Sequence, residues 1–373
     1  MKALALIILT LASSILIAQT KTVNTCQWPK LKKLKNGQEI KTYTFHFWDY
    51  VRKNFKSTFP SIANENGFVA GDFHFNNVTA GFNPQVGYAQ LFLADSDDAG
   101  YSIQLADYIK YISFLKSIYS DLNEENILKA YASEVLNNET KDHQNDIPKK
   151  ISHLLSLSET DFQDYNTNYV LRKLNDVNSR FAKKFDLSPI TELSSEFKKI
   201  AAFTQKSLKS EGELLDSGYK INSSGSSIGM TRLLFLLKSK NNLNIFELKE
   251  QRCAAVEKMT PQTKEMKEFT QSTLKQIMNL THIESQKITY PPRQFLLRKK
   301  IDNQIEKLEI EKFDKVDFQK YSEFFARILG LFHSGSSTDV YKKYLRTGLL
   351  KKAELISEFS KNYLTQLEAD LKK

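Results

Sequence analysis

The hydrophobic pattern of this chain changes its period twice, and this limits the folds open to it. Between Ile103 and Ile118 apolar residues recur every three or four positions, which predicts a long amphipathic helix. In the middle of the chain they form short runs bounded by turn residues, which is typical of strands. The strands predicted there cover residues 231–238, 245–249, 284–289 and 293–299, and the first two form an antiparallel hairpin. From Tyr321 the helical spacing returns, so we predict an α+β fold in which a small strand-rich part interrupts a largely helical body.

The other predicted elements are shorter. Apolar residues at helical spacing predict a helix over 43–59, which Pro60 ends. Two apolar runs at 67–70 and 88–94 are flanked by Gly, Asn or Asp, which favours strands that meet polar loops. A further helix is expected at about 262–280.

Length and charge exclude some classes and leave others open. The 373 residues, 41% apolar and 26% charged, are typical of a folded globular protein of two or three structural units. The net charge of +10 is compatible with nucleic acid, anionic lipid or phosphorylated ligands. No zinc-finger, RNP or helix-turn-helix signature accompanies it, so we expect no specific nucleic-acid binding. No Gly-x-Ser-x-Gly elbow favours a serine hydrolase, and no Cys or His spacing favours zinc.

The N-terminus is typical of an exported protein. Residues 1–18 form an almost unbroken apolar stretch that ends in small residues, which predicts a signal peptide cleaved after Ala18. A retained membrane anchor is the alternative. Export to the periplasm or the medium would permit a disulfide between Cys26 and Cys253, and the sequence leaves open whether the two meet.

The string VAGDFHFNN at residues 69–77 is the most informative for chemistry. A strand ends at Asp72, Asn77 follows five positions later, and Asp95 follows the next predicted strand. Phosphoryl transfer requires a carboxylate that orients the attacking hydroxyl, and an amide and a second carboxylate that hold magnesium. These residues therefore predict a phosphotransferase-type site. The alternative is that Asp72 and Asn77 only cap a turn.

A second set of residues is typical of phosphate binding. Gly225 and Gly229 bound a Ser/Gly loop, and Lys249 lies on the second strand of the predicted hairpin. Glycine lets the backbone approach phosphate oxygens, and a strand lysine can pair with them. The alternative is a plain connector and a solvated lysine at the sheet edge.

We expect two histidines, His74 and His333, to have structural rather than catalytic roles. In an extended segment His74 is expected to point away from Asp72 and to bond the backbone. His333 is expected to close a long helix as a C-terminal cap.

These motifs resemble the bacterial domain-of-unknown-function family 2252, over roughly residues 40–345. The strings that carry the resemblance, in order, are GDFHFNN (71–77), LADSDDAG (93–100), LADYIKYI (105–112), GSSIGMTR (225–232), FELKE (246–250), FLLRKKI (295–301) and LGLFHSGSS (329–337). The family is similar to the protein-kinase and aminoglycoside-phosphotransferase superfamily. The resemblance implies a kinase-like two-lobed fold whose lobe order is permuted, with the catalytic loop ahead of the glycine loop.

The resemblance also implies roles for single residues. Asp72 would be the catalytic base, Asn77 and Asp95 would bind Mg²⁺, and Asp107 would brace the catalytic loop from behind. Gly225, Gly229 and Lys249 would bind the phosphates of ATP. The chain departs from the pattern in having Ala70 where antibiotic kinases have a histidine, and in having the additional Met230. The glutamate that would pair with Lys249 stays open among Glu257, Glu265 and Glu268.

The sequence thus divides into five segments. They are a signal peptide (1–18), an N-terminal extension (19–42), a helical part with the catalytic loop (43–215), a strand-rich nucleotide-type part (216–300) and C-terminal helices (301–373). The expected function is that of an exported ATP- and Mg²⁺-dependent phosphotransferase with an unidentified acceptor. The alternatives are an inactive kinase-like protein that binds a nucleotide, metabolite or protein, and a metal-dependent hydrolase that uses the same carboxylates. Against the first stands the scarcity of ATP outside the cytoplasm.

Overall fold

A computed structural model describes most of the chain. The described residues are 28–34, 39–83, 87–136, 147–162, 181, 185–222, 229–239, 242–278, 285–290, 293–300 and 305–373. The predicted signal peptide and Cys26 lie outside them. Within them, no helix is both long and apolar enough to cross a bilayer.

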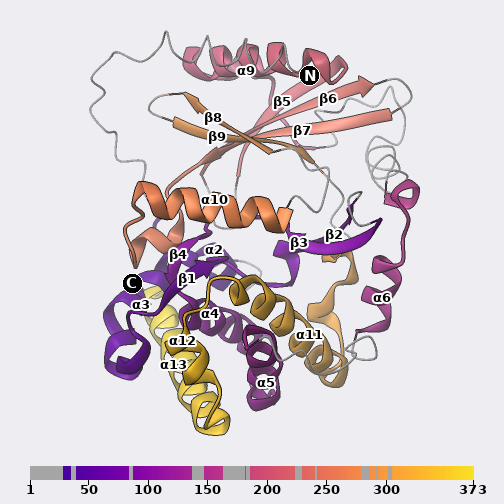
Figure 1. Cartoon of the computed structure of the whole chain (residues 1–373). Coiled ribbons are helices and arrows are strands. Elements are labelled where there is room, and N and C mark those ends of the chain that lie inside the picture. Colours follow the sequence, from indigo (N-terminus) through magenta and orange to yellow (C-terminus); the bar gives the residue numbers. More distant parts are fainter. Residues whose placement is uncertain are drawn as a thin grey trace.

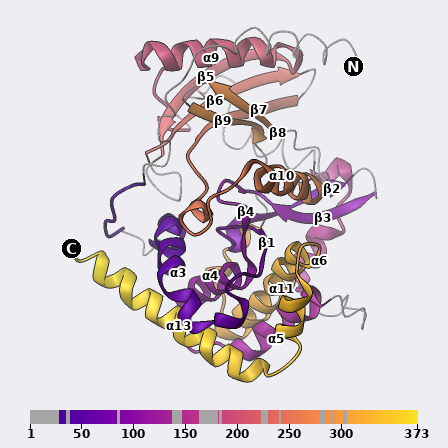
Figure 2. The same ribbon diagram turned by 60° about the vertical axis from the view of Figure 1, so that its left-hand side comes forward.

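The structure has an α+β fold with its strands in three antiparallel sheets, as the periodicity predicts. Figure 1 shows the largest sheet above a body of helices, with one helix on its outer face and another between the sheet and the helical body. Figure 2 shows the same layers after rotation. We refer below to the sheet unit (β5–β9 with α9) and to the helical body.

The sheet unit has the strand order β5-β6-β7-β9-β8. Its strands are β5 (Glu213–Ile221), β6 (Thr231–Ser239), β7 (Asn242–Gln251), β8 (Ser285–Tyr290) and β9 (Arg293–Lys300). Helix α9 (Ser195–Ser207) covers the outer face, and α10 (Lys264–Met278) lies on the side of the helical body (Figure 1).

The centre of this sheet explains the unbroken apolar run in β6. Leu233, Phe235 and Leu237 pack in one hydrophobic cluster with α9. Leu234 and Leu236, which point to the opposite face, pack with Ile245 and Phe181 in another. A strand buried on both faces needs apolar residues at every position, so β6 shows no alternation.

The helical body contains the remaining helices and two small sheets. Its helices are α2 (Glu39–Thr42), α3 (Thr44–Thr58), α4 (Gln104–Lys116), α5 (Glu124–Val135), α6 (Lys149–Leu155), α11 (Lys315–Ser334), α12 (Asp339–Leu345) and α13 (Leu349–Asp370). Strand β1 (Asn66–Val69) pairs with β4 (Gly100–Ile103), and β2 (Val78–Asn83) pairs with β3 (Tyr88–Leu93). Short 3₁₀ turns include η2 (Phe75–Asn77), η6 (Ala255–Lys258) and η8 (Ile310–Lys312).

Helix α4 lies at the centre of this body. Every residue from Gln104 to Leu115 is buried, including the charged Asp107 and Lys110. Charged side chains inside a protein are tolerated only when they are paired and hydrogen-bonded. These two therefore indicate where the polar contacts of the helical body converge.

Most predicted elements are confirmed, and the errors have a common cause. The predicted helices correspond to α3, α4 and α10, and the predicted strands to β1, β3, β6, β7, β8 and β9. The sequence analysis missed β2, β4 and β5, in which glycine and polar residues interrupt the apolar pattern. The Ser/Gly loop precedes the β6–β7 hairpin in the chain, and the strand before it is β5.

The packing of α11 on α5 gives a test of the helical body. A Cβ atom added at Gly330 would lie 2.5 Å from Tyr131 O and 2.9 Å from Glu134 Cβ. We expect Gly330→Ala to lower the free energy of unfolding by about 1–2 kcal/mol, because overpacking outweighs the better helix propensity of alanine. Urea unfolding followed by circular dichroism measures this change.

Gly335 provides the matched control. It follows the same helix with φ −70°, and an added Cβ would have no atom within 4 Å. Gly335→Ala should therefore cause no loss of stability. An equal loss in both variants would show that helix packing at Gly330 is not the cause.

Candidate functional site

The loop after β1 is held in one conformation by its backbone. Gly71 has a φ of +79°, and a side chain at this position would collide with the backbone of Asp98. Its carbonyl oxygen accepts a hydrogen bond of 2.8 Å from Trp48 Nε1. The loop therefore requires glycine directly before Asp72.

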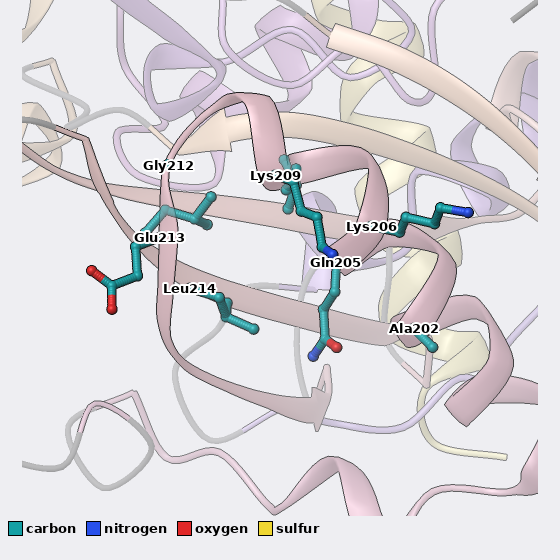
Figure 3. Close-up of a pocket in the computed structure, with 9 residues that line it drawn as sticks. Ala202, Gln205, Lys206, Lys209, Gly212, Glu213 and Leu214 are labelled. Carbon is teal, nitrogen blue, oxygen red and sulfur yellow. The ribbon is translucent and has the colours of Figure 1, made fainter. Parts of the chain in front are cut away.

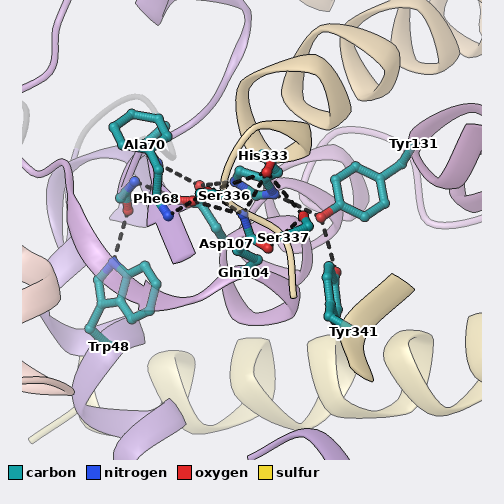
Figure 4. A network of polar contacts seen from close by, with 11 residues as sticks. Trp48, Phe68, Ala70, Gln104, Asp107, Tyr131, His333, Ser336, Ser337 and Tyr341 are labelled. Carbon is teal, nitrogen blue, oxygen red and sulfur yellow. Dashed lines mark hydrogen bonds and ion pairs between the residues drawn. The ribbon is translucent and has the colours of Figure 1, made fainter. Parts of the chain in front are cut away.

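Asp107 binds the same loop from inside the body. Its carboxylate accepts hydrogen bonds from Ala70 N (2.7 Å) and Gly71 N (3.0 Å), which confirms that this residue braces the loop (Figure 4). Its Oδ2 also lies 3.1 Å from His333 Nε2. These contacts give the buried carboxylate the hydrogen-bond partners that a polar group at this depth requires.

The interpretation of His333 as a helix cap is therefore corrected. His333 lies in the last turn of α11, but its ring is fully buried between Asp107 and Tyr131, whose Oη is 2.7 Å from Nδ1. Figure 4 shows this chain of contacts extending to Tyr341. The ring thus connects α11 to the loop through Asp107.

Asp72 is buried, with 6% of its surface exposed, and is paired with a lysine. Lys110 Nζ donates to Asp72 Oδ1 at 2.8 Å and to Ile40 O at 3.0 Å. The sequence analysis did not identify Lys110, although a signal was present: it lies seven positions after Ile103, on the apolar face of the predicted helix. A lysine on such a face requires a buried partner, and Asp72 is that partner.

The prediction for His74 is wrong. Its backbone is extended, as expected, but Nε2 lies 3.7 Å from Asp72 Oδ2. In an extended segment residues two apart share one side, so the spacing favours proximity. Burial lowers the pKa of His74 to about 4, although the charge of Asp72 opposes this shift. The ring is thus neutral at neutral pH.

Asn77 and Asp95 lie together at the open end of the β2–β3 hairpin. The first register pair of this hairpin is Val78 with Leu93, and beyond it Ala94 N donates to Asn77 O at 2.8 Å. Asn77 Nδ2 donates to Asp72 O at 2.8 Å. Asn77 therefore contacts the backbone of Asp72 through its side chain, and its own backbone pairs with Ala94, the residue before Asp95.

Lys249 reaches Asp95 from the sheet unit. It lies on β7 between β6 and β9, and it is fully buried, so the interpretation as a solvated edge lysine is wrong. Its Nζ lies 2.9 Å from Asp95 Oδ2 and 3.1 Å from Oδ1, and it also forms an ion pair with Asp97.

None of the three candidate glutamates makes this contact. Glu257 lies 3.8 Å from Lys267, Glu268 lies 3.8 Å from Lys264, and Glu265 is exposed. The partners of Lys249 in the described part of the chain are the aspartates that follow β3. These aspartates lie more than 150 residues before Lys249 in the chain, so local sequence does not indicate the pairing.

The charged groups at this contact shift one another's pKa values. Burial alone would raise the pKa of Asp95, but Lys249 and Arg298 outweigh it and hold the pKa well below its usual range. Burial and the neighbouring Asp95 raise the pKa of Asp97. Burial disfavours the charged form of Lys249, yet the two carboxylates raise its pKa. The pKa values of Asp95 and Lys249 thus move in the directions that favour their charged forms.

Arg298 supports the same loop from β9. Its Nη1 donates to Ala94 O at 2.8 Å, while Nε and Nη2 donate to Glu247 Oε2. Glu247 is buried and also accepts from Arg232. The residue before Asp95 is therefore anchored to the sheet unit independently of Lys249.

Asp98 is a further buried carboxylate beside the loop after β1. Its Oδ1 accepts from Ala255 N at 2.8 Å. Burial and the charge of Asp72 raise the pKa of Asp98 to about 7. The sequence analysis gave Asp98 no role, because its proximity to Gly71 and Asp72 depends on the fold.

The glycine loop is described only in part. Gly225 lies outside the described residues. Gly229 has a φ of +80° and donates from its N–H to Asn222 O at 2.7 Å, where the loop between β5 and β6 ends. Gly229 lies three positions before Arg232, which is the cross-strand neighbour of Lys249. Gly229 therefore lies at the end of the sheet where Lys249 lies.

A pocket of about 520 Å³ lies elsewhere, between the end of α9 and the start of β5 (Figure 3). Its lining residues include Gln205, Lys206, Lys209 and Glu213. None of the candidate site residues lines this pocket, so the pocket gives no information about their chemistry.

The comparison with protein families agrees with the resemblance in the sequence. The profile of a family described as "Uncharacterized protein conserved in bacteria (DUF2252)" matches residues 99–373. The chain belongs to this family. Comparisons with curated proteins and with solved structures found no match.

The family match covers only some of the candidate site residues of this DUF2252 protein. Asp107 and Lys249 lie within the matched residues, whereas Asp72, Asn77 and Asp95 precede them. The three residues that precede the match therefore rest on the geometry described above.

The oxygen donors of this DUF2252 site suit magnesium. Asn77 Oδ1 and the Asp95 carboxylate, whose side chain is 27% exposed, are hard donors. No group of three or more His, Cys, Asp or Glu side chains in the described ranges could hold a metal ion by itself. Magnesium commonly takes one or two carboxylates from the protein and its remaining ligands from water and phosphates, so the residues fit a nucleotide-bound ion.

Asp98 gives a pH-dependent prediction. Its pKa is about 7 in the folded protein and 3.8 when unperturbed, so its contribution to stability is full below pH 4 and is lost as the pH rises through 7. We expect Asp98→Asn to stabilise the protein at pH 8, by at most about 4 kcal/mol, because each pKa unit corresponds to about 1.36 kcal/mol. At pH 4 the variant and the original chain should unfold alike, since asparagine keeps the acceptor for Ala255 N.

Thermal unfolding at pH 4 and pH 8 measures this difference. Asp49→Asn is a suitable control, since Asp49 forms only surface pairs with Arg52 and Lys53. A loss of stability in Asp98→Asn at pH 8 would contradict the assignment, because it would show that the Asp98 charge is favourable.

Proposed function

We propose that this protein is a phosphotransferase that uses ATP and Mg²⁺ on a kinase-like two-lobed fold with permuted lobe order. The observation that carries the proposal is the contact of Lys249 with Asp95. It joins a buried strand lysine beside a glycine loop to a carboxylate beside Asn77 and Asp72. Phosphoryl transfer in kinases uses the same types of residue: a strand lysine, a metal-binding aspartate and asparagine, and a base.

The arrangement of the two parts also supports this proposal. The antiparallel sheet carries Lys249 and Gly229, and the helical body carries Asp72, Asn77 and Asp95. In the chain, the loop with Asp72 precedes the loop with Gly229. This is the order that a permuted kinase-like fold would have.

The proposed mechanism assigns each step to residues of this chain. Asp72 orients the acceptor hydroxyl and takes its proton, while Lys110 holds the carboxylate in place. Lys249 would pair with the phosphates of the donor, and Asn77 Oδ1 and Asp95 would hold the ion. Magnesium, when bound, neutralises charge on the transferred phosphoryl group. Asp107 keeps the backbone before Asp72 in position.

The cellular location bears on the donor. The predicted leader implies export, and Cys253 is disulfide-bonded, which favours an oxidising compartment. ATP is scarce there, so an exported phosphotransferase would need an uncommon source of phosphate.

A binding protein without transfer is the second candidate. It is favoured by the same exported location and by the contacts of Lys249, which pairs with two carboxylates of its own chain. A metal-dependent hydrolase is a third candidate, in which water replaces the acceptor. The binding protein and the hydrolase would use the same carboxylates as the phosphotransferase. The three candidates differ in whether a reaction follows binding and in what accepts the phosphoryl group.

The role of Asp95 can be tested by nucleotide binding. We expect Asp95→Asn to abolish the Mg²⁺-dependent part of ATP binding and to leave adenosine binding unchanged, because adenosine has no phosphates to share the ion. Isothermal titration calorimetry with and without Mg²⁺ separates the two parts. Unchanged ATP affinity in the variant would remove Asp95 from the site.

The role of Asp72 can be tested by turnover. Asp72→Asn keeps an oxygen that can accept from Lys110, so the fold should be preserved better than with alanine. We expect phosphate release from ATP and Mg²⁺ to fall by at least about 100-fold, because positioned acid–base groups typically contribute this much to the rate. ATP affinity should stay within a few-fold of that of the original protein.

Other outcomes would select among the candidates. A large loss of ATP affinity in Asp72→Asn would make Asp72 a ligand or a structural residue. ATP binding without turnover in the unaltered protein, with a panel of hydroxyl acceptors added, would favour the binding protein. Release of phosphate to water that no acceptor accelerates would favour the hydrolase.

A further inference from the structure

Asp97 is a second carboxylate on the Lys249 nitrogen, and the proposed function gives it no role. Its Oδ2 pairs with Lys249 Nζ, and its Oδ1 accepts 2.8 Å from Gln251 Nε2. Lys249 and Gln251 are two apart on β7, so their side chains share one face of the strand. Both oxygens of Asp97 are thus held by this face.

The contacts of Lys249 fix its orientation. An ammonium group has three donors. Asp95 lies at 2.9 and 3.1 Å, and Asp97 completes the set. Because Asp95 is 27% exposed and Asp97 only 15%, Asp95 is the carboxylate better placed to turn toward an ion or ligand. Asp97 remains as the enclosed partner.

Kinase-type sites need such a partner. Their strand lysine is held toward the phosphates by a glutamate from a neighbouring helix. Of the three candidate glutamates, Glu257 pairs with Lys267, Glu265 is exposed, and the side chain of Glu268 on α10 is 65% exposed. The enclosed acidic side chain on Lys249 instead comes from the loop after β3.

We propose that Asp97 is the residue that positions Lys249 for the phosphates of the nucleotide. This inference rests on the proposed function and deepens it. Its consequence is that Asp95, the metal-binding candidate, and Asp97, the partner of the lysine, belong to one loop. Arg298 anchors this loop at Ala94 O. A shift of α10 alone then leaves the lysine in place, because no side chain that the structure describes on α10 pairs with it.

The test compares ATP with adenosine in single and double variants. Asp97→Asn keeps the acceptor for Gln251 and removes the charge that pairs with Lys249. We expect it to weaken binding of ATP with Mg²⁺ about tenfold, the effect of losing a hydrogen bond to a charged group, and to leave adenosine binding unchanged. Calorimetry measures both ligands, and thermal unfolding confirms that each variant is folded.

A double-variant cycle and a control complete the design. If Asp97 acts through Lys249, Lys249→Met with Asp97→Asn should bind ATP no more weakly than Lys249→Met alone. Lys249→Arg, which keeps a cation, is the second variant if the methionine variant does not fold. Glu268→Gln should bind ATP as the original protein does.

Each other outcome overturns the inference. Tighter ATP binding in Asp97→Asn would show that Asp97 competes with phosphate, and unchanged binding would show that it has no role. Equal losses for ATP and adenosine would show a merely structural role, and a loss in Glu268→Gln would return the role to α10. If the unaltered protein binds neither ligand, the proposed function itself fails and the inference fails with it.

Discussion

A buried carboxylate on α4 holds the candidate site together. Asp107 accepts the N–H groups of Ala70 and Gly71 and contacts His333, so it ties the loop after β1 to the end of α11. An unpaired carboxylate at this depth would be strongly unfavourable, and the surrounding network is therefore needed for the fold as well as for the site. Three residues later the same helix presents Lys110 to Asp72. One helix thus sets both the backbone of the loop and the orientation of its carboxylate.

The sheet unit meets this body through charges. Lys249 on β7 contacts Asp95 and Asp97, and Arg298 on β9 donates to Ala94 O. All these acceptors lie in one short loop after β3. A lysine with no exposed surface needs its carboxylate partners, so the docking of the sheet unit on the body and the formation of the candidate site are the same event.

Much of the candidate site could be predicted from the residue types and their order in the sequence. Asp72, Asn77, Asp95 and Lys249 were selected from strand positions and from the family resemblance. In the structure Asn77 contacts the backbone of Asp72 and of Ala94, the residue before Asp95, and Lys249 pairs with Asp95. The partners of these residues were not predicted. The contacts of three further residues, Lys110, Asp97 and Asp98, are with residues distant in sequence. No local sequence pattern predicts which partner such a residue will meet. His74 was placed on the wrong side because the two-residue period of an extended chain was not applied to it.

The sequence by itself determined the α+β class, most helices and strands, and the acidic and basic residues that follow the strands, because all of these depend on local periodicity and turn chemistry. Tertiary structure decided which charges meet. A carboxylate becomes a partner of Lys249, or a weak acid like Asp98, only when burial removes water and brings a particular charge near it, and these two effects arise from the packing of distant segments.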